Sequence, residues 1–168
     1  MELFTGGKPF IELTRDELLK IKNQEAFIPI IYSEIVVLLK NKYGNDYTLQ
    51  RLRKMGHMLA DGILKHWTPH KIRSVQDIIE ETYQVFLYRG LKTKKVLDKI
   101  YVRDENCPVC YFNVSDSDIP FCIVISGLIE RIINNLRKYN PKLPEISVDN
   151  ISSRSMGKDL CIHAISFK

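Results

Sequence analysis

The sequence predicts an α+β domain in which a run of helices precedes a small, mostly antiparallel sheet. Apolar residues recur at helical spacing in the first half of the chain, up to about residue 90. Apolar and polar residues then alternate within the segments 97–104 and 145–167, as they do in half-buried strands. Helices followed by strands are typical of the α+β class, and a chain of 168 residues with 45% hydrophobic content can bury a core.

Four helices are expected in the first half, after a loosely structured lead-in over residues 1–13. Thr14-Arg-Asp-Glu17 fits a capping box, which marks the start of a helix. Gly44 is a typical C-terminal stop, and Ser74 can cap a helix that Gly90 ends. The expected segments are a short helix from Thr14, a second from Pro29 to Gly44, a third over 48–66 and a fourth from Ser74 to Gly90.

The second half is expected to hold the sheet and one long helix. A strand starts at Leu97 and leads directly into the segment Cys107-Pro-Val-Cys110. Residues 111–119 are expected to be strand or loop, and a helix with a broad apolar face follows over 120–138. Strands at 145–152 and 159–167 are expected to pair as a hairpin around a turn at Arg154–Lys158.

Glycines make two of the expected helices thin. Gly56 and Gly62 lie in the helix 48–66, and Gly127 lies in the helix 120–138. A glycine costs about 1 kcal/mol in a helix interior relative to alanine, so its presence asks for a reason. Close approach to another helix or to a ligand is one explanation, and chance is the other.

Composition excludes some classes of function. The net charge is +5, but the basic residues are spread among the acids, and the groups Arg51–Lys54 and Lys92–Lys95 are interpreted as solvated faces or loops. No nucleic-acid partner is therefore expected. The chain has no run of about 18 apolar residues, so no membrane span is expected. The N-terminus lacks a secretory signal pattern, which predicts a cytoplasmic location.

Cysteine spacing suggests a metal site. Cys107 and Cys110 form a C-x₂-C turn, which supplies two zinc ligands from one short loop. Cys122 and Cys161 can complete a four-cysteine zinc site, and His163 is an alternative fourth ligand because it lies two residues from Cys161 on the same strand face. The competing interpretation is four free thiols, since buried cysteines are common in apolar segments.

Other chemistry is disfavoured. A redox pair of the thioredoxin type needs a helix directly after its first cysteine, and the segment after Cys110 is a poor helix start. The four histidines show no H-E-x-x-H pattern, and Gly6-Gly7-Lys8 lacks the spacing of a phosphate loop. We therefore expect a binding protein rather than an enzyme.

Several segments together resemble the vinyl-4-reductase domain family, whose fold is shared with small subunits of the TRAPP tethering complexes. The cysteine pair after a strand is similar to the family's own pair. The resemblance covers roughly residues 48–168 and rests on four segments in the family's order: LRKMGHMLADGIL, DENCPVCYF, PFCIVISGLIERIINNL and SMGKDLCIHAI. One departure is Ser153, which stands where the family tends to carry a further cysteine.

The resemblance implies a mixed helix–sheet domain, often dimeric, with a pocket for a small apolar or hydrocarbon-like ligand. We expect this ligand between the sheet and the two thin helices, as a sensor or carrier module would hold it. A vinyl-group reductase is a less favoured interpretation. The expected ligand-binding residues are Gly56, Leu59, Gly62, Ile63, Cys122, Ile125 and Gly127.

The expected organisation is an N-terminal helical segment over residues 1–47 and a ligand-binding domain over 48–168. The alternative function is that of an assembly or tethering subunit without a ligand. One small sheet cannot bury every apolar stripe, so the helical segments near 28–39 and 75–86 are expected to face a partner. A second copy of the chain is the commonest partner, and we expect a homodimer.

Overall fold

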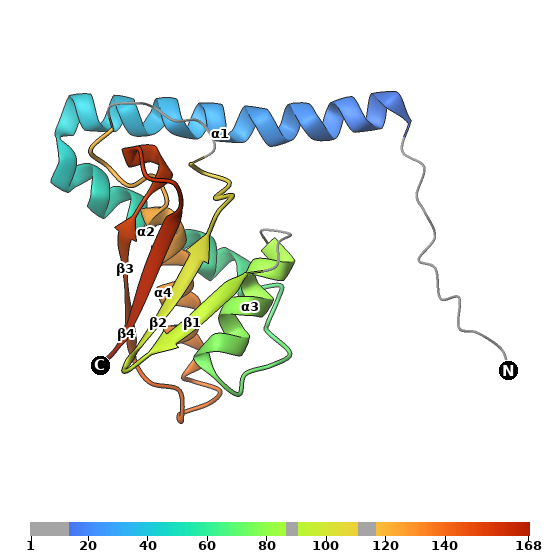
Figure 1. Cartoon of the computed structure of the whole chain (residues 1–168). Coiled ribbons are helices and arrows are strands. Elements are labelled where there is room, and N and C mark those ends of the chain that lie inside the picture. The colour runs from blue at the N-terminus through green and yellow to red at the C-terminus, as the bar shows by residue number, and fades with distance from the viewer. Residues whose placement is uncertain (1–13, 87–90, 111–116) are drawn as a thin grey trace, which may run out of the picture.

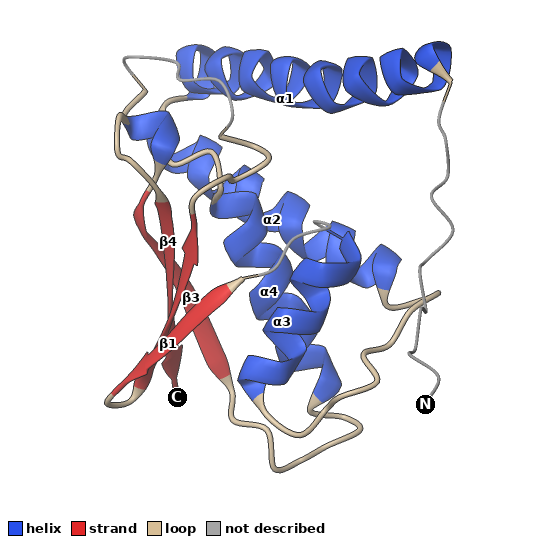
Figure 2. Cartoon of the chain, turned by 45° about the vertical axis from the view of Figure 1, so that its right-hand side comes forward, coloured by secondary structure: helices blue, strands red, loops and turns tan. Residues whose placement is uncertain are grey.

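The computed structural model describes residues 14–86, 91–110 and 117–168, with the side chains of 16–28 and Lys92 left aside. Its elements confirm the α+β class: helices and an antiparallel sheet form two layers (Figure 2). In chain order they are α1 (Arg15–Tyr43), α2 (Asn45–Ile63), α3 (Val75–Phe86), β1 (Lys92–Val96), β2 (Lys99–Asp104), α4 (Ile123–Leu136), β3 (Ile146–Ser152), the short 3₁₀ helix η1 (Arg154–Met156) and β4 (Cys161–Phe167).

Helix α1 corrects the expectation of two separate N-terminal helices. It runs unbroken from Arg15 to Tyr43, with Pro29 inside it. A proline removes one helical hydrogen bond and usually breaks or kinks a helix, which is why the sequence suggested a boundary there. The expected start after Thr14 and the stop at Gly44, which has φ 82°, are both confirmed. Figure 1 shows α1 crossing one end of the molecule, with its N-terminal part projecting beyond the rest.

The sheet has the strand order β1-β2-β4-β3, and all its neighbours are antiparallel. The predicted hairpin of the last two strands is confirmed, with an irregularity in register between Asn150 and Ser152. Strand β1 was not predicted, because its sequence KTKKV has no apolar alternation and suggested a loop. Alternate residues of β2 and β4 point inward, among them Val102, Asp104, Cys161 and His163.

Helices α2 and α4 cross at their glycines. A Cβ atom added to Gly56 would lie 2.1 Å from the backbone oxygen of Val124, and one added to Gly127 would lie 2.4 Å from the backbone oxygen of Arg53. These distances are shorter than any real carbon–oxygen contact, so only glycine permits this approach. Of the explanations that the sequence left open, helix–helix contact holds for both positions. Gly62 differs, because a Cβ there would have no atom within 4 Å.

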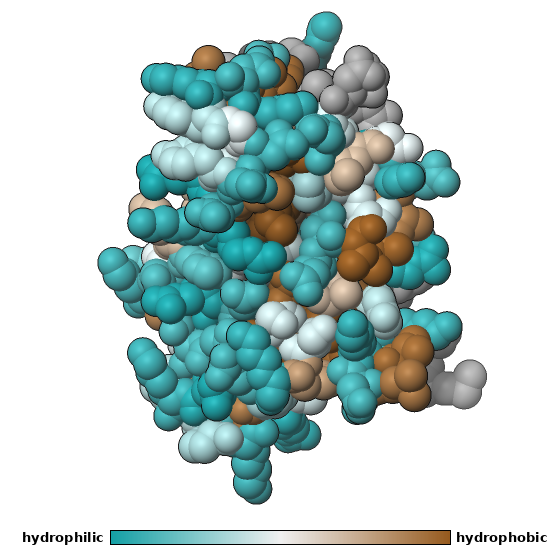
Figure 3. Space-filling model, turned by 90° about the vertical axis from the view of Figure 1, so that its left-hand side faces the viewer, coloured by the Kyte–Doolittle hydropathy of each residue, from teal (hydrophilic) through white to brown (hydrophobic). Residues whose placement is uncertain are grey.

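The core lies between the sheet and the helices, with α4 at its centre. Most residues of α4 are buried, including Ile129, Ile132 and Ile133. Helix α3 also buries most of its apolar residues in this core, among them Ile78, Ile79 and Tyr83, while Val85 is exposed. The expectation that the segment 75–86 faces a partner is therefore wrong for these residues. On the side of the molecule seen in Figure 3, hydrophilic residues predominate and hydrophobic residues form separate patches.

Candidate functional site

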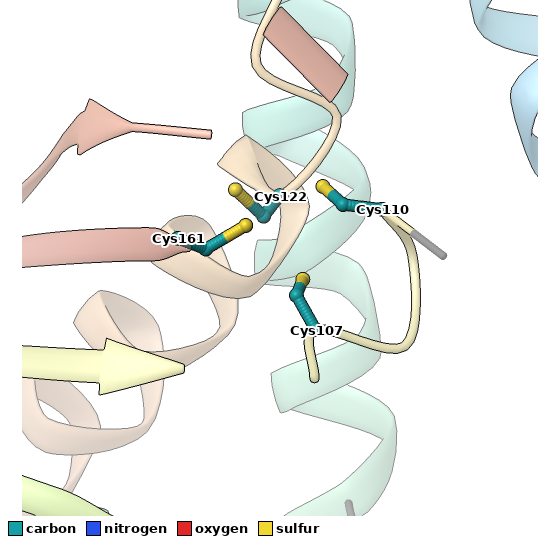
Figure 4. A group of neighbouring side chains, drawn as sticks. All are labelled: Cys107, Cys110, Cys122 and Cys161. Carbon is teal, nitrogen blue, oxygen red and sulfur yellow. The ribbon is translucent and has the colours of Figure 1, made fainter. Parts of the chain in front are cut away.

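Three separate parts of the chain bring the four cysteines together at the end of the sheet nearest α1. Cys107 and Cys110 follow β2 on a tight turn, in which the Cys110 N–H donates to the Cys107 carbonyl at 3.2 Å. Cys122 directly precedes α4, and Cys161 begins β4 opposite Asp104 of β2. The four sulfur atoms lie within 4.8 Å of one another and point toward a common centre (Figure 4). This confirms the predicted convergence of Cys122 and Cys161 on the pair.

The cluster is sealed from water, since all four cysteine side chains are buried. Polar hydrogens nevertheless point at its sulfur atoms. The Asn150 side-chain amide donates to Cys122 Sγ at 2.9 Å, and the Arg154 backbone N–H donates to Cys161 Sγ at 3.4 Å. Such donors stabilise the thiolate form, which is the form that binds metal.

Ser153, the departure from the family pattern noted in the sequence, lies beside the cluster. Its hydroxyl lies 3.4 Å from the sulfur atoms of both Cys110 and Cys122, and 2.8 Å from the Ser155 hydroxyl. Ser153 is thus a neighbour of the sulfur atoms, while Cys107, Cys110, Cys122 and Cys161 form a complete set of four without it.

Packing the thiols together shifts their ionisation strongly. Hydrogen bonding with Cys107, Cys122 and Cys161 holds the pKa of the Cys110 thiol far below its usual range. Hydrogen bonding, first of all with Cys110, raises the pKa of the Cys107 thiol, and burial raises it further. One thiol thus ionises readily while a second keeps its proton, because two negative charges repel in a buried site. A bound cation removes this conflict, because it stabilises all four thiolates at once.

The distances fit a single metal ion. Zinc–sulfur bonds of about 2.3 Å in a tetrahedron place the sulfur atoms about 3.8 Å apart, which agrees with a cluster confined within 4.8 Å. The cluster can therefore hold a metal ion with only small shifts of its side chains.

Tyr32 of α1 lies next to the cluster. Its hydroxyl donates to the Phe121 carbonyl at 2.7 Å, and its ring meets the Phe121 ring edge-on at a centroid distance of 6.2 Å. Burial raises the pKa of the Tyr32 hydroxyl, and the charges of Cys110 and Cys122 raise it further. These contacts link α1 to the residue directly before Cys122.

His163, the alternative metal ligand, has a different partner. Its Nδ1 lies 2.8 Å from the Ser126 hydroxyl of α4, and its Nε2 is buried without a hydrogen-bond partner among the described residues. Burial lowers the pKa of His163 to about 4, so the ring is neutral near pH 7. Cys122, rather than His163, completes the set of four.

The residues expected to bind a ligand fall into two groups. Gly56 and Gly127 lie at the helix crossing, and Cys122, directly before α4, and Ile125, within α4, are buried. Leu59 and Gly62 lie on the exposed surface of α2, where Leu59 is 53% exposed and Gly62 faces open space, whereas Ile63 is half-buried and packs against the core. The structure therefore does not bring all seven residues to one place.

Comparison with known proteins supports the fold. No protein-family model matches the chain, and no curated protein is significantly similar to it. A solved structure of trafficking protein particle complex subunit 3 from Naegleria fowleri, covalently bound to palmitic acid, is similar with a TM-score of 0.61 and 15% identity, over 88% of this chain and 96% of that one. The chain therefore has a TRAPP-subunit-like fold, as the sequence resemblance implied.

Two further solved structures are similar to the chain. The phenol-responsive sensory domain of the transcription activator PoxR, with phenol, matches with a TM-score of 0.51 and 12% identity, over 85% of this chain and 74% of that one. A vinyl-4-reductase family protein from Methanocaldococcus jannaschii matches with a TM-score of 0.43 and 17% identity, over 96% of this chain and 99% of that one. The trafficking subunit is thus of one of the kinds of protein that the sequence resemblance named.

Proposed function

We propose that this chain is a binding module for a small, largely apolar molecule, on a scaffold held together by a structural zinc ion. The four buried sulfur atoms within 4.8 Å of one another carry the metal part of this proposal. Zinc is favoured because it prefers four thiolates in tetrahedral geometry. Four protein ligands fill the coordination shell, which suits a structural role rather than a catalytic one. Cysteines that form no disulfide suit a reducing compartment such as the cytoplasm.

The zinc ion would join elements that are far apart in the sequence. Cys107 and Cys110 belong to the turn after β2, Cys122 to the start of α4 and Cys161 to β4. The binding free energy of a structural zinc adds to folding, because the unfolded chain has no preformed site. A rigid end of the sheet is a suitable base for a ligand-binding module.

The similar proteins support the ligand part of the proposal. The trafficking subunit carries palmitic acid and the sensory domain was solved with phenol, and both molecules are largely apolar. In this chain α2 exposes the apolar side chain of Leu59 and the open space at Gly62, a surface that a small molecule can reach. We place the ligand's entry on this side, next to the helix crossing at Gly56 and Gly127.

A direct test is to extract the purified protein with organic solvent and identify released molecules by mass spectrometry. We expect a fatty acid or another small apolar molecule at a substantial fraction of the protein concentration. Leu59→Glu should reduce the amount, because an apolar ligand bound over this position would remove the new charge from water. Arg51→Glu, an exposed change on the same helix, serves as the control. Extracts that match a blank, together with no thermal shift from palmitate or phenol, would reject the ligand proposal.

A homodimer is a second proposal, favoured by one side of α1. Ile31, Ile35 and Leu38 recur at helical spacing on its outer face, and Leu38 is 65% exposed. The opposite face of α1 packs on the protein through Pro29, Ser33 and Val36. An apolar stripe of this kind is typical of a helix that packs against a second copy.

Light scattering at micromolar concentration tests the dimer. The wild-type protein should have twice the mass of the chain, and Leu38→Glu should shift it to the single-chain mass. Met58→Gln, which changes a comparably exposed residue of α2, should leave the dimer intact. A wild-type mass of one chain would exclude the dimer at this concentration.

A further inference from the structure

The end of the molecule opposite α1 carries two projecting segments. One is the tip of the β1–β2 hairpin, and the other is the loop between α4 and β3; both views place them at the end away from α1 (Figures 1 and 2). The cysteine cluster lies at the other end of the sheet, where β2 ends and β4 begins. Neither projecting segment is explained by the metal site, the ligand proposal or the dimer.

Leu97 at the hairpin tip is an unusual choice of residue. It is 88% exposed, the highest value among the large hydrophobic residues described, and Val96 beside it is also exposed. Its φ of 52° lies in the left-handed region, where asparagine or glycine is the ordinary residue of a tight hairpin. Water contact is unfavourable for an apolar side chain, and a left-handed backbone is unfavourable for leucine. A residue that combines both indicates a side chain that contacts another surface.

Tyr139 projects from the second segment. It is 75% exposed and follows α4, where its N–H donates to the Leu136 carbonyl at 2.9 Å. The next residue fixes the loop, because the Asn140 side-chain amide donates to the Ile72 carbonyl at 2.7 Å. The tyrosine ring is therefore presented on an anchored loop. Tyrosine prefers the boundary between an apolar phase and water, since its ring is apolar and its hydroxyl is polar.

Lysines flank both apolar tips. Lys94, Lys95 and Lys99 are exposed around Leu97, and Lys138 and Lys142 are exposed around Tyr139. None of these five lysines is in an ion pair with a residue that the structure describes. Nearby Glu145 is already paired with Arg137 and Lys168, which leaves Asp98 as the acidic residue of the hairpin turn. The positive charge at this end is thus available to an anionic partner.

We propose that this end docks on an anionic lipid bilayer, with Leu97 and Tyr139 entering the interface and the lysines contacting lipid phosphates. Basic residues that surround projecting apolar side chains are the pattern that binds such surfaces. A protein partner usually needs a contiguous apolar patch, whereas Leu97 and Tyr139 are single residues on two separate projections. The docking is peripheral, since no helix in the described part of the chain is long and apolar enough to cross a membrane.

Sedimentation with vesicles tests the apolar contacts. The wild-type chain should co-sediment with phosphatidylcholine vesicles that contain about 30% phosphatidylserine, and bind those of phosphatidylcholine alone at least about tenfold more weakly. Leu97→Asn and Tyr139→Ser should each weaken binding to the anionic vesicles, by about tenfold for Leu97→Asn. Asparagine tolerates the left-handed backbone, so the hairpin should still form. Met58→Gln is the control for the loss of an exposed apolar side chain elsewhere.

The charge contribution is tested by the double change Lys95→Glu and Lys99→Glu. It should weaken binding to the anionic vesicles by more than about tenfold, because each lysine near such a surface contributes about a fivefold factor. The matched control is Arg51→Glu with Lys54→Glu, which changes the net charge equally on α2. Equal losses in the two double variants, or no wild-type sedimentation, would overturn the proposal. A change in oligomeric mass caused by Leu97→Asn would instead make the tip a protein interface and also overturn it.

Discussion

Removing the metal from the cysteine cluster is expected to lower the midpoint of thermal unfolding by about 10 °C or more. The four thiols are buried side by side, so loss of the ion removes the cation that would stabilise all four thiolates at once. The protein is purified without chelator and is then treated with a zinc chelator in the presence of a non-thiol reductant. Its thermal unfolding is followed by circular dichroism. Adding zinc back should restore the original midpoint.

A cysteine variant separates the metal from general effects of the chelator. Cys110→Ser should show the low midpoint without treatment and no response to the chelator, since it removes one of four ligands. Ser153→Ala is the matched control, because it changes a buried neighbour of the same sulfur atoms without removing a ligand. Metal content far below one zinc per chain in the untreated protein, or a midpoint unaffected by chelation, would refute the structural zinc.

Replacing Gly56 with alanine is expected to reduce the free energy of unfolding by about 3 kcal/mol or more. The added methyl group would lie 2.1 Å from the Val124 backbone oxygen, and neither helix backbone can yield without moving the crossing of α2 and α4. Urea denaturation with unchanged slope measures the difference.

Gly62→Ala is the control on the same helix. Its new methyl group meets no atom within 4 Å, so alanine's better helix propensity should raise stability by up to about 1 kcal/mol. The two substitutions are chemically identical and should have opposite signs. If Gly56→Ala were no more destabilising than Gly62→Ala, this would contradict the tight crossing.

The fold could be predicted from the sequence wherever local pattern and tertiary structure agree. Periodicity and caps located α2, α3 and α4 to within a few residues, and the hairpin of β3 and β4 followed from its turn. The continuity of α1 through Pro29 could not be predicted in the same way. The cost of a proline inside a helix can be read from the local sequence, but the packing of α1 on the rest of the protein cannot. Strand β1 was missed because it lies at the edge of the sheet, where charged residues are tolerated on both faces. Its sequence therefore lacks the alternation of apolar and polar residues that indicates a strand.

The cysteine cluster was only partly predictable. The spacing of Cys107 and Cys110 indicated two ligands, but the choice between Cys122 and His163 depended on where α4 starts and how β2 and β4 align. Nothing in the sequence indicated that Asn150 or Tyr32 would lie at the cluster, because their contacts join separate elements. Asn150 of β3 donates a hydrogen bond to Cys122, and the ring of Tyr32 of α1 lies beside that of Phe121. The ligand-binding residues remain a prediction.

The order of the ligands along the chain also bears on how the protein is made. During synthesis, Cys107, Cys110 and Cys122 leave the ribosome first, while Cys161 follows only after β3 and η1. A growing chain therefore holds three sulfur ligands without the strand that places the fourth. The complete tetrahedral site can close only when β4 inserts between β2 and β3, its two neighbours in the sheet. In the proposed zinc site, metal capture would thereby be tied to the insertion of this central strand, so that zinc would not stabilise a sheet that lacks β4.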